Sequence, residues 1–226
     1  MFAKDFLALF YPSLCIICAS NLLKHEECIC ISCLHQTPKT DCFINSKNDV
    51  SERFWGRIQL ENAAALFDFN KDGNAQKLIH QLKYEEGKNV GIFLGKQLAY
   101  AINESDCFNN IDIVIPVPLH SKKQKLRGYN QSDFIAKGIK EILDIKVNKQ
   151  SLIRIENTDS QTRKKRFSRW ENMMNSFDLR SNKKIKGKHI LLVDDVITTG
   201  STLEACAQKL QEVEGVKVSI ATIAVA

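Results

Sequence analysis

Short unbroken apolar runs recur along the chain and alternate with segments whose apolar residues follow a helical period. Unbroken apolar runs are typical of strands that are covered on both faces. They predict strands at 63–69, 111–117, 152–155, 190–193 and 216–225, with a brief extended piece at 177–179. The helical period predicts helices at 2–10, 74–85, 92–101, 132–143 and 203–213. Strands that alternate with helices indicate an α/β fold, with a mainly parallel sheet and helices on both faces.

The strand at 190–193 leads into the string VDDVITTGST, which carries the most specific chemistry in the chain. Two carboxylates, Asp194 and Asp195, lie where the strand is expected to end. A turn of glycine and small hydroxyl residues at 198–202 then leads to the next helix. Ionised carboxylates accept hydrogen bonds from ribose hydroxyls, and a helix N-terminus with free N–H groups attracts phosphate. In the alternative interpretation, the aspartates are only turn residues before a capped helix. The full string favours a sugar-phosphate site.

A second candidate region follows the strand at 111–117. That strand runs into a Pro-Val-Pro turn, and the loop at 119–131 is dense in cations. Ligands of α/β sheets bind at the carboxyl ends of strands, so cations in this loop are well placed for a diphosphate. The alternative for this charge run is a solvent-exposed surface. A further basic segment at 158–172 has no clear apolar period at its start and resembles a mobile cover.

Six of the eight cysteines lie within residues 15–42. Two C-x-x-C pairs among them present four thiolates to one tetrahedral ion, and zinc is the natural occupant. The predicted ligands are Cys15, Cys18, Cys30 and Cys33. A site closed by four protein ligands is structural, because it leaves no position for a substrate. Cys28 or His35 remains open as a substitute in the second pair, and a redox C-x-x-C is the lesser alternative, because no thioredoxin-like strand precedes it.

The length of 226 residues is enough for one α/β core and a small appendage. A formal charge of +6 favours anionic ligands such as polyphosphates or nucleic acid. No apolar run approaches the ~18–20 residues that cross a bilayer, and the first residues lack the features of a signal peptide. We therefore expect a cytoplasmic protein without membrane insertion. Taking the polar segment 39–59 as a joint, we predict an N-terminal helix and zinc ribbon at 1–55 and a main domain at 56–226.

Taken together, these features resemble the ComF family of competence-associated, phosphoribosyltransferase-like proteins. The matching pieces, in the family's order, are FYPSLCIIC with CISC, LIHQLKY, IPVPLHSKKQKLRGYNQS, SQTRKKRFSRWEN and LLVDDVITTGST. Tyr129 is a mild departure, since many relatives have Phe there. The resemblance implies a zinc ribbon fused to a type I phosphoribosyltransferase fold that binds 5-phosphoribosyl 1-diphosphate (PRPP).

The resemblance also implies roles for individual residues. The ribose hydroxyls of PRPP would meet Asp194 and Asp195. Its 5-phosphate would be held by Thr198, Thr199, Gly200, Ser201 and Thr202. The diphosphate loop would comprise Pro116, Val117, Pro118 and Leu119, with Arg127 and Asn130 nearby. The flexible cover would bring catalytic cations to the diphosphate leaving group, namely Arg163, Lys164, Arg166 and Arg169.

PRPP binding implies Mg²⁺, which bridges diphosphate and ribose oxygens with few protein ligands. In a transferase reaction, diphosphate leaves ribose C1 through a cationic transition state, while the protein neutralises the leaving group and excludes water. The expected function is PRPP binding with Mg²⁺ and a part in DNA uptake or natural transformation. The sequence names no acceptor and does not indicate an oligomeric state.

Three roles remain open at this point. The first is a pentosyl transferase that acts on an unidentified acceptor. The second is a non-enzymatic adaptor that binds PRPP and single-stranded DNA and works with a helicase-like partner. Its basic segments carry three aromatic residues for base stacking, Tyr129, Phe167 and Trp170. The third is a structural adaptor with a vestigial pocket, and the intact string VDDVITTGST argues against it.

Overall fold

The computed structural model describes residues 12–84, 87–155 and 176–226. The helix predicted at 2–10 and the cover predicted at 158–172 lie outside these ranges. The described helices are α2 (Ile31–His35), α3 (Asp49–Glu52), α4 (Asn74–Gln81), α5 (Gly87–Asn103), α6 (Ser121–Arg127), α7 (Gln131–Leu143) and α9 (Ser201–Gln211). The described strands are β1 (Ala63–Asp68), β2 (Ile113–Pro116), β3 (Lys146–Val147), β4 (Leu152–Arg154), β5 (Phe177–Leu179), β6 (His189–Ile197) and β7 (Lys217–Val225).

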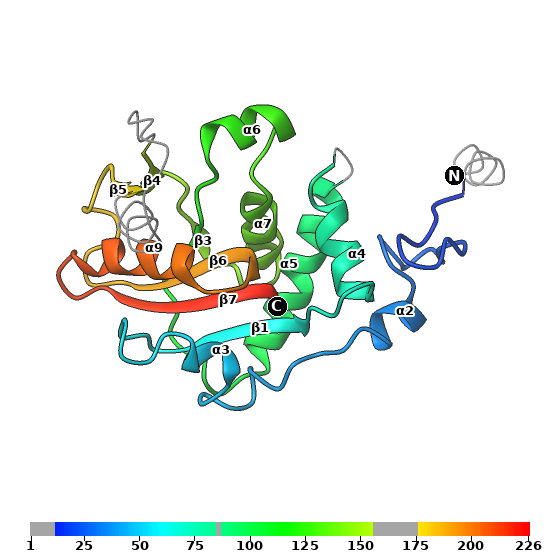
Figure 1. The fold of residues 1–226 in the computed structure, drawn as a ribbon, viewed down its shortest axis with the longest axis horizontal. Helices are drawn as coiled ribbons and strands as arrows, with labels where there is room; N and C mark the ends of the chain where they lie inside the picture. The colour runs from blue at the N-terminus through cyan, green and yellow to red at the C-terminus, as the bar shows by residue number, and fades with distance from the viewer. Residues whose placement is uncertain (1–11, 85–86, 156–175) are drawn as a thin grey trace, which may run out of the picture.

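Five strands form one parallel sheet in the order β1-β7-β6-β2-β3 (Figure 1). The two long strands β6 and β7 pair from His189 opposite Lys217 to Ile197 opposite Val225. Every residue of β2 is buried, as are most residues of β1 and β7. Burial on both faces explains why these segments are unbroken apolar runs in the sequence. The predicted parallel sheet is confirmed.

Helices cover both faces of this sheet. The crossovers from β1 to β2 and from β2 to β3 step in one direction across the sheet, whereas the crossover from β6 to β7 steps back. Because parallel crossovers are right-handed, α5 and α7 lie on one face and α9 lies on the other. α5 and α7 pack closely against each other. Gly95 and Gly138 permit this approach, since a β-carbon at either position would collide with the backbone of the facing helix.

The structure departs from the predicted elements in two places around the candidate site. The cation-rich loop at 119–131 contains a helix, α6. His120 caps it by accepting a hydrogen bond at Nδ1 from the Lys122 amide at 3.1 Å, and Gly128 ends it in a left-handed conformation with φ 76°. β6 also continues beyond its predicted end at residue 193, because its pairing with β7 continues through Asp194 opposite Thr222.

Two further predicted elements, one strand and one helix, need correction. The strand predicted at 152–155 is not part of the main sheet: β4 pairs antiparallel with β5, Leu152 opposite Leu179, in a separate two-stranded sheet. An apolar run of this length identifies a strand but does not identify its partner. The helix predicted from residue 92 begins earlier, at Gly87. The Gly87 amide donates to the Tyr84 carbonyl at 2.8 Å.

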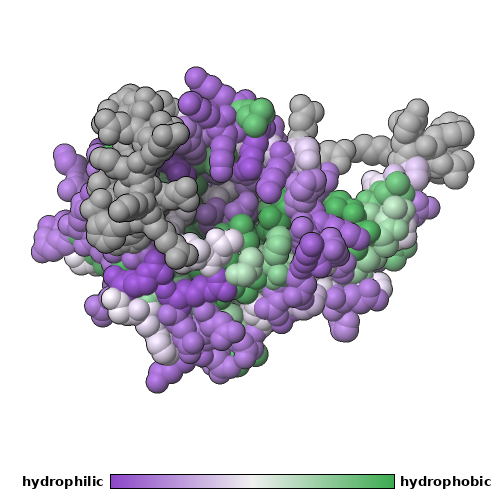
Figure 2. Space-filling model, viewed as in Figure 1, coloured by the Kyte–Doolittle hydropathy of each residue, from purple (hydrophilic) through white to green (hydrophobic). Residues whose placement is uncertain are grey.

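The cysteine-rich ribbon at residues 12–37 lies beside α4, at the opposite end of the molecule from the β4–β5 sheet (Figure 1). Lys96 forms an ion pair with Glu27 at 3.0 Å, and the Asn74 side chain donates to the Cys33 carbonyl at 3.4 Å. Figure 2 shows hydrophobic residues on the visible face of the ribbon and mainly hydrophilic residues over α6. None of the helices within the described ranges is both long and apolar enough to span a membrane.

The segment predicted as a joint, 39–59, is anchored to β1 by side-chain and main-chain hydrogen bonds. The Thr40 amide donates to the Leu66 carbonyl at 3.1 Å, and the Asn48 side chain donates to the Ala63 carbonyl at 3.1 Å. Asn48 also caps α3, which packs on β1. This segment therefore has a fixed position relative to the sheet.

Candidate functional site

The neighbouring strands β2 and β6 bring together the two segments that the sequence singled out. Pro116 lies opposite Val193, and the Val117 amide donates to the Val193 carbonyl at 2.9 Å. The loop of residues 116–119 therefore begins beside Asp194 at the same carboxyl edge of the sheet. This is the edge at which ligands of α/β sheets bind.

Asp194 and Asp195 are half-buried at this edge. Asp194 Oδ1 accepts hydrogen bonds from Ser132 Oγ at 2.8 Å and from the Asp195 amide at 2.9 Å. Burial is the largest cause that raises the pKa of Asp194 to about 7, and the charge of Asp195 is the next largest. The Ser132 hydroxyl and the charge of Arg154 oppose this rise. Burial also raises the pKa of Asp195, against the opposing charges of Arg127 and Lys83. A cation or a hydrogen-bond donor at this edge would stabilise the ionised pair.

The 198–202 turn joins β6 to α9. Gly200 occupies the N-cap position in a left-handed conformation, with φ 77°, and has no side chain to cap the helix, while the Ser201 amide donates to Thr199 Oγ1 at 3.4 Å. Thr199 Oγ1 and Ser201 Oγ lie 3.1 Å apart. A small cavity of about 60 Å³ is lined by Asp194 and by residues 196–203. Hydroxyl groups and the amino end of α9 thus surround a hollow beside the aspartates, an arrangement that suits an anion.

Asn130 contacts the loop of residues 116–119, and Arg127 lies near the aspartates. Asn130 is buried, its amide donates to the Val117 carbonyl at 2.9 Å, and its Oδ1 accepts from the Ser132 amide at 3.3 Å. Asn130 therefore supports the loop and caps α7. Arg127 ends α6 and acts electrostatically on Asp195. The predicted cover residues Arg163, Lys164, Arg166 and Arg169 lie outside the described residues.

Three groups near the aspartates were absent from the predicted site, namely Lys83, Ser132 and Arg154. The sequence signal for Lys83 is the piece LIHQLKY, which contains it. In the structure Tyr129 contacts the residues on either side of Lys83. Tyr129 Oη donates to the Leu82 carbonyl at 2.6 Å and contacts the Tyr84 carbonyl, so it holds the chain on both sides of Lys83. The guanidinium of Arg154 lies 5.1 Å from the ring centroid of Phe177. Residues as distant in sequence as these carry no local pattern that links them.

Burial of Tyr129 corrects one element of the DNA-binding hypothesis. Its side chain is 6% exposed and its hydroxyl is engaged with the backbone, so it cannot stack on a base. The other two aromatic residues of that hypothesis, Phe167 and Trp170, lie outside the described ranges.

The four predicted metal ligands converge in the ribbon. The sulfur atoms of Cys15, Cys18, Cys30 and Cys33 all lie within 4.8 Å of one another, and neither Cys28 nor His35 belongs to this group. Backbone amides point at the sulfurs: the Cys30 amide donates to Cys15 Sγ at 3.4 Å, and the Cys33 amide donates to Cys30 Sγ at 3.5 Å.

The protonation chemistry of these thiols fits a bound cation. A hydrogen bond with the Ser20 hydroxyl is the main cause that lowers the pKa of Cys18 to about 6. Burial, together with the neighbouring thiols, raises the pKa of Cys33 well above its ordinary value. A bound cation would favour the thiolate form of all four clustered sulfurs. The donor set therefore suits zinc, which binds thiolates in a tetrahedral geometry.

A family model described as "Phosphoribosyl transferase domain" matches residues 130–225. The match runs from the N-cap of α7 to the end of β7 and contains the aspartate pair and the 198–202 turn. Together with the parallel sheet and its strand order, this match defines the chain as a protein with a type I phosphoribosyltransferase-like fold and an N-terminal four-cysteine cluster.

Three curated relatives carry names that refer to DNA utilization or to competence. The chain is 32% identical over 136 residues to the DNA utilization protein YhgH of Salmonella typhimurium, covering 59% of each chain. It is 31% identical over 139 residues to competence protein F of Haemophilus influenzae, covering 60% of this chain and 61% of that protein. It is 35% identical over 100 residues to competence protein ComFC of Bacillus subtilis, covering 44% and 38%. These relatives and the family model support the resemblance to the ComF family that the sequence motifs indicated.

These matches span about three fifths of the length of the first two relatives. Among solved structures, the glutamine PRPP amidotransferase of Bacillus subtilis, complexed with ADP and GMP, is 22% identical with a TM-score of 0.43, covering 65% of this chain and 30% of that chain. A purine phosphoribosyltransferase from Pyrococcus horikoshii is 18% identical with a TM-score of 0.37, covering 61% and 73%. The fold assignment rests on the strand order and the family model rather than on these two similarities.

Proposed function

We propose that the chain binds PRPP together with Mg²⁺ at the carboxyl edge of β2 and β6. One observation carries this proposal: the pairing of β2 with β6 sets the loop of residues 116–119 beside Asp194, which also lines the cavity of the 198–202 turn. A single ligand that bears a diphosphate, a ribose and a 5-phosphate needs three such adjoining sites. The family-model match supports the same ligand class.

In this proposal each part of PRPP has its own contacts. The ribose hydroxyls donate to Asp194 and Asp195, and the 5-phosphate accepts hydrogen bonds from the 198–202 turn. The diphosphate lies along residues 116–119, and Arg127 and Lys83, whose charges act on Asp195, are candidate cations for it. The four cover cations complete its neutralisation. Mg²⁺, when bound, supplies further charge stabilisation to the leaving diphosphate.

Calorimetry tests the proposal directly. Titration of PRPP into the protein in the presence of Mg²⁺ should give saturable binding, and omission of Mg²⁺ should weaken it. Inorganic diphosphate and ribose 5-phosphate, titrated separately, should each compete with PRPP because each fills part of the site. Absence of PRPP binding to correctly folded protein would remove the assignment. Release of diphosphate in the presence of candidate acceptors would identify a pentosyl transferase.

We further propose that the protein takes part in DNA uptake or natural transformation, on the basis of the relatives named for competence and DNA utilization. An adaptor role that includes single-stranded DNA and a helicase-like partner is the second candidate. The observation that favours it is α6, which exposes Lys122, Lys123 and Lys125 directly after the loop of residues 116–119. If α6 follows a DNA backbone, affinity for an oligonucleotide should fall steeply with salt, and neutralising the three lysines should flatten that dependence. Absence of binding at low salt would leave only the small-ligand role.

We also propose that Cys15, Cys18, Cys30 and Cys33 hold one structural zinc ion. With all four ligands supplied by the protein, the ion has no open position for a substrate and serves the fold of the ribbon. The division into a ribbon unit at 1–55 and a phosphoribosyltransferase-like domain at 56–226 is part of the same proposal. Limited proteolysis of the zinc-loaded and zinc-stripped protein tests it, since metal removal should expose the ribbon alone to cleavage.

A further inference from the structure

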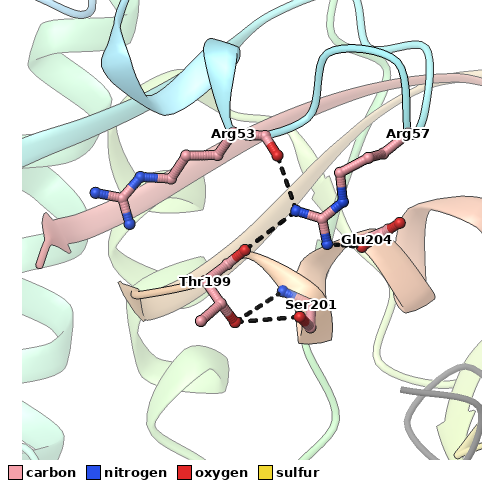
Figure 3. A network of polar contacts seen from close by, with 5 residues as sticks. All are labelled: Arg53, Arg57, Thr199, Ser201 and Glu204. Atoms are coloured by element: carbon pink, nitrogen blue, oxygen red, sulfur yellow. Dashed lines mark hydrogen bonds and ion pairs between the residues drawn. The ribbon is translucent and has the colours of Figure 1, made fainter. Parts of the chain in front are cut away.

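A short segment that precedes β1 packs against the back of the 198–202 turn (Figure 3). Arg53 donates a hydrogen bond from its guanidinium to the Thr198 carbonyl, and Arg57 Nη1 donates to the Thr199 carbonyl at 3.3 Å. Between them, the ring of Phe54 lies directly under Gly200, so that a β-carbon on this glycine would stand 3.0 Å from the ring. Three consecutive residues of the turn are thus contacted by one segment, residues 53–57.

The orientation of these carbonyl groups determines what the turn presents to a ligand. Within the described residues every peptide bond is trans, and in a trans peptide the C=O and N–H bonds point in opposite directions. A guanidinium that holds the Thr198 carbonyl on one side therefore directs the Thr199 amide to the other side. The Thr199 carbonyl, held by Arg57, directs the Gly200 amide in the same way. Both amides are then available to an anion on the side away from the arginines.

The charge of Arg57 has a second effect at the same place. Arg57 Nη2 forms an ion pair with Glu204, whose side chain is 2% exposed and lies in the first turn of α9. An uncompensated carboxylate at a helix N-terminus would repel a phosphate bound there. Arg57 also donates to the Arg53 carbonyl at 2.9 Å, so the two arginines hold each other in place. The pair therefore shapes the turn and neutralises the buried Glu204 behind it.

We propose that Arg53 and Arg57 are positioning residues for a terminal phosphate group, which they orient through the backbone of the 198–202 turn without contacting it. This proposal rests on the proposed PRPP site. It adds the residues that order the part of that site where the 5-phosphate would bind. Among the described residues, no hydrogen bond or ion pair of segment 53–57 reaches residues 116–119, where the diphosphate is proposed to lie. The two halves of the ligand should therefore respond differently to loss of the arginines.

The test compares the affinities of two partial ligands, ribose 5-phosphate and Mg²⁺-diphosphate, by calorimetry. Arg53→Gln and Arg57→Gln should each lower the affinity for ribose 5-phosphate on the order of tenfold, as expected when a hydrogen bond that orders a charged site is lost. The affinity for Mg²⁺-diphosphate should stay unchanged. Lys186→Gln is the matched control, since it removes an exposed ion pair with Glu214 at the opposite edge of the sheet.

Arg57→Gln leaves the buried Glu204 without a partner, so a second variant, Arg57→Gln with Glu204→Gln, keeps the fold testable. This double variant should still bind ribose 5-phosphate more weakly than the parent, because the Thr199 carbonyl remains unheld. Equal affinity of parent, Arg53→Gln and the double variant for ribose 5-phosphate would overturn the inference while leaving the PRPP site in place. Equal losses for both partial ligands would also overturn it, because they would indicate general destabilisation. A parent that binds neither ligand would overturn both proposals.

Discussion

The hydroxyl of Ser132 donates a hydrogen bond to Asp194 Oδ1 at 2.8 Å and so joins the first turn of α7 to β6. The same turn holds Asn130, whose side chain fixes the Val117 carbonyl. One helix N-terminus therefore positions both the aspartate pair and the loop of residues 116–119. This arrangement explains how two segments far apart in the sequence can act on one ligand.

The aspartate pair should be required for PRPP binding. Hydrogen bonds to charged groups contribute roughly 1.5–3 kcal/mol each, so Asp194→Asn combined with Asp195→Asn should weaken PRPP binding on the order of a hundredfold. The variant should remain folded, because asparagine keeps an acceptor for Ser132. Glu104→Gln with Asp106→Asn removes two exposed acids elsewhere and serves as the control. Parent-like affinity in the folded aspartate variant would exclude this pocket.

The pH dependence of stability should reveal Asp194. Its pKa in the folded protein is about 7, and in the unfolded chain it is about 3.9. Between these values the folded state holds more protons than the unfolded state, so the free energy of unfolding falls as pH rises from about 4 to about 7, by at most about 1.4 kcal/mol per pH unit. Asp194→Asn removes this loss. Urea unfolding should therefore show that the free energy of unfolding of the variant, relative to that of the parent, increases between pH 5 and pH 8. A constant difference would contradict the assignment.

Loss of the metal should unfold the ribbon. Metal analysis of the purified protein should give one zinc per chain, and Cys18→Ser or Cys33→Ser should lower that content and make residues 12–37 susceptible to protease. Cys107→Ser is the control, because this cysteine lies outside the four-sulfur cluster. Less than about half an equivalent of zinc in a protein whose ribbon is intact would refute the metal site.

The hydroxyl of Tyr129 should matter to both stability and ligand binding. Tyr129→Phe leaves the Leu82 carbonyl without this donor, and we expect a loss of about 1 kcal/mol in the free energy of unfolding. Because the hydroxyl also fixes the chain around Lys83, affinity for Mg²⁺-diphosphate should fall several-fold. Tyr100→Phe, on the exposed side of α5, should change neither quantity. Unchanged diphosphate affinity in Tyr129→Phe would remove Lys83 from the site.

The sequence by itself determined the features that depend on local spacing. The run at 190–193 indicated a doubly covered strand because every residue in it is apolar, and the structure buries all four. The two C-x-x-C pairs indicated a four-sulfur cluster because each turn presents its two thiols together, and the four sulfurs do converge. The caps of α6, His120 and Gly128, were also present in the sequence, but the density of cations around them favoured a loop.

Only the tertiary structure decided which distant groups meet. The register of β2 against β6 depends on the order of strands in the sheet, which no local pattern records, and it places residue 117 beside residue 193. The same holds for Ser132 with Asp194 and for Arg57 with Glu204, residues that lie 62 and 147 positions apart. Hydrogen bonds of this kind form after the helices and strands have packed. Their partners are therefore set by topology and packing rather than by the spacing of residues along the chain.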